Sequence, residues 1–147
     1  MRDYLRDYAT AAFIFYARNG MSAEKYKKKL YIEVLESQKK NEGGSGGISK
    51  PTESAIIAAE REVNSKIAEI MDMEAVEKVI AELDVRQRRD IIQAIEYVYF
   101  NNCNEKSEDI KARVHNAETY IPASERSIYR WLRQARDLFA IERGLRI

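Results

Sequence analysis

The sequence predicts an all-α protein with an N-terminal helical hairpin and a C-terminal helix-turn-helix domain. Apolar residues recur at steps of three and four along nearly the whole chain, which is typical of amphipathic helices. The alternation typical of strands is absent, and only two prolines, Pro51 and Pro122, interrupt the 147 residues. We expect residues 1–72 to form the hairpin and residues 73–147 to form the helix-turn-helix domain.

The first two predicted helices have recognisable ends. A helix over Asp3–Arg18 would stop at Gly20, because glycine adopts the left-handed conformation that ends helices. Ser22 is a suitable N-cap for a second helix that continues to about Lys40. The stretch Asn41–Lys50 reads NEGGSGGISK and predicts a flexible loop, with a composition that natural and engineered linkers share.

A third, long helix is predicted to open at Pro51 and Thr52. Its apolar stripe consists of Ile56, Ala59, Val63, Ile67, Ile70 and Met71. That spacing suits antiparallel packing on the second helix, as in an αα-hairpin. Asp72 is predicted to mark a bend or a restart, and it closes the N-terminal region.

The C-terminal region predicts four further helices. Val76–Leu83 and Ile91–Tyr99 carry apolar residues at helical spacing, and a polar loop, Asn101–Lys106, follows them. Ser107–Tyr120 and Ser124–Arg143 then read as two helices joined by a short turn. Pro122 separates the two, Ser124 can cap the second, and Gly144 would end it.

The last predicted helix has two chemically different faces. Its apolar residues are Ile128, Trp131, Leu132, Ala135, Leu138 and Phe139, and we expect Trp131 to pack in the core. The other side carries Arg126, Tyr129, Arg130 and Arg133. A capped, arginine-bearing helix that packs on a preceding short helix is the helix-turn-helix arrangement for reading DNA.

Particular DNA contacts follow from this arrangement. Arg126 and Ser127 lie near the helix start, where base edges are read, and Arg130 and Arg133 continue the same side. The further candidates are Tyr129 and Gln134 for bases or phosphate, Lys111, Arg113 and Arg136 for phosphate, and Arg143 and Arg146 for the backbone beyond the helix end. The alternative is a solvated face with Glu–Arg pairs, which is also the prediction for the basic runs Lys25–Lys29 and Arg86–Arg89.

Composition limits the other function classes. The net charge is only +1, so the basic excess is local: Arg126–Ile147 holds six arginines against Asp137 and Glu142, which gives +4. A single cysteine, Cys103, and a single histidine, His115, are too few for a disulfide or a zinc cluster, so we expect no metal, no cofactor and no catalytic activity. No apolar run reaches membrane-spanning length, and we expect a cytoplasmic protein without a membrane partner.

Three motifs in the C-terminal half carry a family resemblance. They are Ala94–Phe100 (AIEYVYF), Ile121–Leu132 (IPASERSIYRWL) and Phe139–Leu145 (FAIERGL). In this order they are similar to ArpU/RinA-like phage transcriptional regulators, and residues 75–147 resemble the four-helix domain with which sigma factors read promoters. The resemblance implies a sigma-like fold for this half of the chain and a role in transcription inside a bacterial host cell.

The resemblance has one departure, in the turn. A helix-turn-helix usually has a small residue in its first helix and a glycine in the turn, and with Ile128 in the core these places fall on Glu118 and Pro122. Ala117 can take the small-residue place if the turn is one residue longer.

The sequence therefore predicts a sequence-specific regulator that binds double-stranded DNA. One recognition helix buries little surface, so we expect either a homodimer or a contact with RNA polymerase to add affinity, with the N-terminal hairpin as the surface for it. Two alternatives stay open. One is a helical interaction or structural module without a DNA role, and the other is a DNA-packaging recognition subunit of the small terminase type, which would form a ring.

Overall fold

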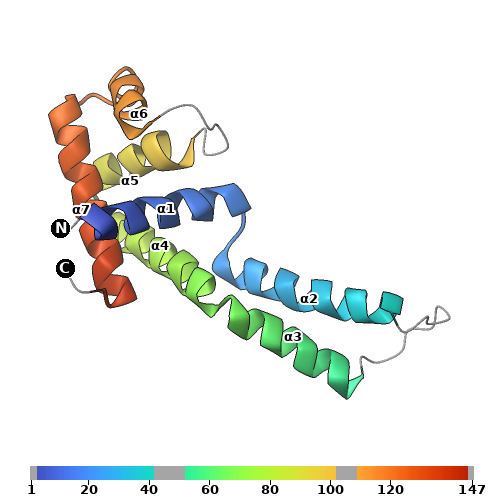
Figure 1. The fold of residues 1–147 in the computed structure, drawn as a ribbon. Coiled ribbons are helices and arrows are strands. Elements are labelled where there is room, and N and C mark those ends of the chain that lie inside the picture. Colours follow the sequence, from blue (N-terminus) through green and yellow to red (C-terminus); the bar gives the residue numbers. More distant parts are fainter. Residues whose placement is uncertain (1–2, 42–51, 102–108, 146–147) are drawn as a thin grey trace.

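The computed structural model describes residues 3–41, 52–101 and 109–145, and every regular element among them is helical (Figure 1). The elements in chain order are α1 (Asp3–Asn19), α2 (Ala23–Asn41), α3 (Glu53–Ser65), α4 (Ile67–Val85), α5 (Arg89–Ile95), the π-helical turn η1 (Glu96–Phe100), α6 (Ile110–Ala117) and α7 (Glu125–Arg143). The predicted all-α class is confirmed.

The hydrophobic core joins the first helix to the last ones. Phe13 of α1 lies fully buried between Tyr99 of η1 and Phe139 of α7, with ring centroids 5.3 and 5.7 Å away. Apolar residues of α4, α5 and α6 complete the same cluster. These aromatic side chains are among the largest in the core, and their burial contributes to the stability of the fold. Helix α1 is therefore part of the core that seats α7.

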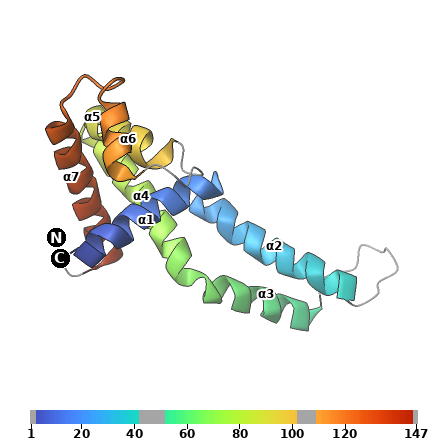
Figure 2. The ribbon, with the colours of Figure 1, turned by 45° about the horizontal axis from the view of Figure 1, so that its top comes forward.

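Helices α2 and α3 form an arm that extends away from this core in both ribbon views (Figures 1 and 2). The two helices are antiparallel, as predicted, and the Ser22 hydroxyl accepts the Lys25 backbone N–H at 3.2 Å at the start of α2. At the base of the arm, the Tyr26 phenol donates to Glu69 of α4 at 2.8 Å. The predicted loop after α2 lies largely outside the described residues.

The chain bends at Lys66, between α3 and α4 (Figure 2), and the predicted bend at Asp72 is wrong. The Ser65 hydroxyl donates to the Glu62 carbonyl at 2.7 Å, and such side-chain bonds compete with the helical ladder and bend helices. Helix α4 then runs unbroken through Asp72. The predicted boundary at residues 72–73 is therefore no break in the fold, and the hairpin is formed by α2 and α3.

Candidate nucleic-acid interface

Both ends of α7 are fixed by the local signals that the sequence contains. The Ser124 hydroxyl accepts the Ser127 backbone N–H at 3.3 Å, which satisfies one of the free donors at the helix start. At the other end Gly144 adopts φ +70°, and the Leu145 N–H bonds to the Ala140 carbonyl at 2.9 Å. The predicted cap and stop are confirmed.

One face of α7 is seated in the core. Ile128, Leu132, Ala135 and Phe139 are fully buried, and Trp131 and Leu138 are partly buried against the same cluster. Trp131 is thus a core-packing residue, as predicted, and not a free platform for stacking bases. Because this face is anchored along about three turns, the orientation of the opposite face is fixed as well.

The opposite face carries a stripe of three exposed arginines, Arg126, Arg130 and Arg133. Their i, i+4, i+7 spacing places them along one line of the helix. None of them forms an ion pair or a hydrogen bond with any other residue that the structure describes. We call these three residues the arginine stripe, and Tyr129 lies beside it with its ring exposed.

Several other arginines of the described chain are paired with carboxylates. Arg86 contacts Glu82 at 2.8 Å, and Arg88 contacts Asp90 at 3.1 Å, which lowers the pKa of Asp90 below its usual value. The remaining pairs in the predicted solvated runs are Arg89–Asp84, Lys28–Glu24 and Lys29–Glu33. Several exposed basic side chains are thus paired with acidic ones, whereas the three arginines of the stripe have no such partner among the described residues.

Two arginines that were predicted to contact phosphate form hydrogen bonds within the protein instead. Arg113 is only 6% exposed, and its Nη1 donates to the Val98 carbonyl at 3.2 Å. Arg136 is half-buried and donates to the Tyr99 hydroxyl at 2.9 Å. The prediction for Arg113 is wrong, because this helix position faces the core and the guanidinium satisfies a backbone oxygen there. Arg136 holds the buried Tyr99 and is not free for phosphate.

The remaining predicted contacts differ in their access to solvent. Lys111 on α6 is exposed, and Ser127 is half-buried at the start of α7. Gln134 is half-buried and lines a hollow between α7 and the junction of α4 with α5. Arg143 is not a backbone clamp, because its Nε lies 2.6 Å from Asp72 of α4, and Arg146 lies outside the described residues.

The Asp72–Arg143 pair belongs to a network that the sequence analysis missed. The Tyr8 phenol of α1 donates to both carboxylate oxygens of Asp72, at 2.7 and 2.9 Å. Burial, and then the bond to Asp72, raise the pKa of Tyr8 above its usual value of 10.0. The network therefore ties α1, α4 and the C-terminal end of α7 together. Its members are 64 and 71 residues apart, so no local pattern could have predicted it.

The turn between α6 and α7 is longer than in a usual helix-turn-helix. Residues 118–124 separate the two helices, Ala117 is buried, and Glu118 is exposed. Ala117 thus takes the small-residue place, as the longer-turn alternative predicts. Tyr120 in the turn stacks on Tyr97 of η1, with centroids 5.5 Å apart, and this contact holds the turn against the core.

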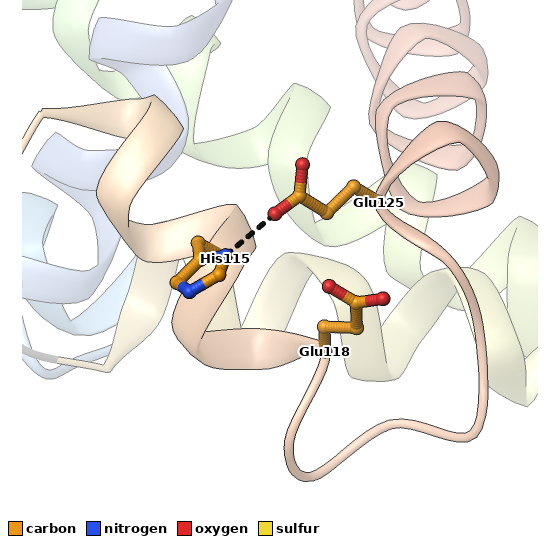
Figure 3. Close-up of side chains that lie close together, drawn as sticks. All are labelled: His115, Glu118 and Glu125. Carbon is orange, nitrogen blue, oxygen red and sulfur yellow. Dashed lines mark hydrogen bonds and ion pairs between the residues drawn. The ribbon is translucent and has the colours of Figure 1, made fainter.

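Three polar side chains gather where α7 begins (Figure 3). The His115 Nδ1 of α6 lies 2.7 Å from the Glu125 Oε1 of α7, and Glu118 stands beside them, with ligand-type atoms within 4.8 Å of one another. Such a set can hold a divalent cation, but the positive end of the α7 dipole at the same place opposes one. We therefore regard the cluster as a polar link between α6 and α7.

In comparisons with family models, curated proteins and solved structures, the chain matches none of them. The function must therefore be argued from the site itself. Among the residues that the structure describes, no helix combines the length and the apolar character needed to cross a bilayer.

Proposed function

We propose that this protein binds double-stranded DNA in a sequence-specific manner, with α7 as its recognition helix, and that it regulates transcription without catalysing a reaction. The arginine stripe carries the proposal, because it is exposed, has no ion-pair partner within the described part of the chain, and is fixed by the buried face behind it. A single α-helix fits the major groove of B-DNA, where an arginine guanidinium can form bidentate hydrogen bonds with the edge of a guanine. In both ribbon views α7 lies at the edge of the molecule opposite the arm (Figures 1 and 2).

The position of each side chain along α7 suggests its role. Arg126 lies in the first turn, nearest to base edges when a recognition helix enters the groove. Arg130 and Arg133 follow one and two turns later and suit bases or phosphate, while the exposed Lys111 of α6 suits phosphate. Glu118 and Glu125 can accept from cytosine N4 and would repel phosphates at the helix start. The proposal therefore places phosphate contacts away from the start of α7.

The regulatory part of the proposal rests on the resemblance of the three C-terminal motifs to phage regulators. A sigma-like arrangement of α4 to α7 belongs to the same proposal, and the packing of α1 against those helices would be an addition to it. A cytoplasmic role beside RNA polymerase in a bacterial host is the setting that the resemblance implies.

The test is selection of bound sequences from a random duplex pool, followed by fluorescence anisotropy titrations at several salt concentrations. Arg130→Ala is the test variant, and Arg61→Ala is the matched control, because Arg61 of α3 is also exposed and makes no ion pair within the described part of the chain. The selected duplex and a scrambled duplex should be titrated in parallel.

We expect an enriched motif and a lower affinity for Arg130→Ala. Loss of one phosphate contact should reduce the salt slope by about 1, and loss of a base contact should cost about 1–3 kcal/mol on the selected duplex. Arg61→Ala should leave both quantities unchanged. Absence of binding even at low salt would contradict the proposal.

A second candidate function is an interaction module that acts through the arm, and the half-exposed isoleucines of α2 and α3 favour it. This candidate predicts no enrichment and no DNA binding at low salt. A DNA-packaging subunit predicts DNA binding together with a ring, so the mass of the protein in solution separates the two DNA-binding candidates.

A further inference from the structure

A groove runs along one face of the arm between α2 and α3. Its volume is about 670 Å³, and it is lined by Glu24, Lys27, Lys28, Tyr31, Ile32, Glu60, Val63, Asn64 and Ile67. The floor is mostly apolar, and charged side chains stand on both walls. In both ribbon views most of the arm extends clear of the other described helices (Figures 1 and 2).

Large apolar side chains on the walls remain open to solvent. Ile32 of α2 is 50% exposed and Ile67 at the start of α4 is 47% exposed, while Ile57 of α3, just beyond the residues that line the groove, is 44% exposed. Ile57 lies one turn before Glu60 and continues the same helix line. Single exposed isoleucines are common, but a row of them along one groove is typical of a surface that binds another protein.

The charges on the two walls are opposite. Lys27 stands on the α2 wall and Glu60 on the α3 wall, and neither forms an ion pair with a residue that the structure describes. Lys28 is already paired with Glu24 of its own helix at 3.2 Å. A partner surface that meets both walls therefore needs an acidic side chain opposite α2 and a basic one opposite α3.

A second copy of the arm supplies an acidic and a basic side chain at matching distances from the base of the arm. Lys27 is four residues from the start of α2 and Glu60 is five from the end of α3, so both lie about 6–8 Å from the base of the arm. Ile32 and Ile57 also match, because each lies about 12–14 Å from the base. A two-fold axis parallel to the arm places α2 of one copy over α3 of the other.

We propose that the arm binds a second copy of this chain, face to face and parallel, in a four-helix bundle closed by Lys27–Glu60 pairs and Ile32–Ile57 contacts between copies. Helix α2 is about 28 Å long and α3 about 20 Å, and each is about 10 Å wide, so two copies would bury about 1,000 Å² in total, just below the usual range of stable interfaces, which begins at about 1,200 Å². A dimer in the micromolar range fits that size.

The parallel arrangement puts both α7-bearing cores at the same end of the bundle. Two recognition helices could then reach two half-sites, which is the usual way in which such dimers gain affinity. The inference itself does not rest on DNA binding, and its test contains no DNA. Failure of one proposal is therefore distinguishable from failure of the other.

The test is sedimentation equilibrium of the full chain between about 1 and 100 μM. We expect a mass that rises with concentration toward twice the 17.1 kDa of one chain. Ile32→Asp and Ile57→Asp should weaken association at least about tenfold, because each places a carboxylate in the apolar contact. The matched control is Val85→Asp, since Val85 is 79% exposed at the far end of α4, and it should dimerise like the unchanged chain.

A charge exchange tests the pairing directly. Lys27→Glu and Glu60→Lys should each weaken the dimer about tenfold, because each creates like-charge contacts twice per dimer. The double variant restores opposite charges and should return to within about threefold of the original affinity. Circular dichroism of every variant checks that the helices persist.

Three results would overturn the proposal. They are a monomer at every concentration, a dimer that is insensitive to Ile32→Asp and Ile57→Asp, and a double charge variant that is no better than the single ones. A mass above that of a dimer would also overturn it, because the two-fold arrangement closes with two copies.

Discussion

The two ends of α7 hold their arginines in different ways. Near the C-terminal end, Arg143 is 14% exposed and pairs with Asp72, which also accepts the Tyr8 hydroxyl. Along the first turns, the arginine stripe points to solvent and has no partner among the described residues. The same residue type thus stabilises the fold at one end and is available for a ligand at the other. Stability measurements and binding measurements should separate the two ends.

The largest expected effect on stability is at the C-terminal end. Asp72→Ala should lower the free energy of unfolding by about 2–3 kcal/mol, because it leaves the largely buried Arg143 guanidinium without its carboxylate. Urea denaturation followed by circular dichroism measures this change. The control is Glu82→Ala, which removes the partner of the more exposed Arg86 and should cost less than about 1 kcal/mol. Equal losses for both variants would mean that the Asp72 network is no more than a surface pair.

A smaller loss is expected at the N-terminal end of α7. Ser124→Ala should destabilise the protein by about 1 kcal/mol, because the Ser127 backbone N–H loses its capping oxygen. Ser124→Thr keeps that oxygen and should keep most of the stability. Thermal unfolding of the three proteins at one pH compares them. If Thr is as harmful as Ala, the cap is not the cause.

Alkaline pH should weaken the C-terminal network slightly. The pKa of Tyr8 is raised by burial, so the folded state holds this proton more tightly than the unfolded state. The resulting contribution is present below about pH 10 and is lost as the pH rises through the raised value. Because Tyr8 is 38% exposed, we expect less than about 1 kcal/mol. Wild type should therefore lose stability more steeply than Tyr8→Phe as the pH rises above about 10 in urea titrations. Parallel curves would exclude this role.

The smallest effect on stability is expected from the arginine stripe itself. Changing Arg126, Arg130 and Arg133 together to Ala should alter the free energy of unfolding by less than about 1 kcal/mol. The three side chains make no ion pair or hydrogen bond with a described residue, and alanine has a high helix propensity. In DNA titrations the same variant should lose about one unit of salt slope for each of these arginines that contacts phosphate, and about 1–3 kcal/mol of affinity for each that contacts a base. A large loss of stability would show that the stripe, like Arg143, stabilises the fold.

The sequence predicted helix ends well, because helix ends depend on neighbouring residues. Ser22, Thr52 and Ser124 act as N-caps, and Gly20 and Gly144 adopt the left-handed conformation after their helices. The buried face of α7 was predictable for the same reason, since it follows from helical spacing alone. These features also fixed which side of α7 would carry exposed arginines.

Predictions that depended on distant contacts were less successful. As a charged residue on a helix, Arg113 was expected to be exposed, yet it is buried and its guanidinium donates a hydrogen bond to the Val98 carbonyl. The bend was expected at the acidic Asp72, but this residue is held inside α4 by partners from α1 and α7, and a serine side chain bends the chain at Lys66 instead. Spacing along one helix contains no information on such partners.

The position of Phe13 between Tyr99 and Phe139 has a consequence for biosynthesis. An emerging chain can pair α2 with α3 early, but the aromatic cluster needs its first and last contributors, which are 126 positions apart in the chain. We expect a nascent polypeptide stalled before Phe139 to leave one side of Phe13 uncovered, and to be a substrate for chaperones until translation ends.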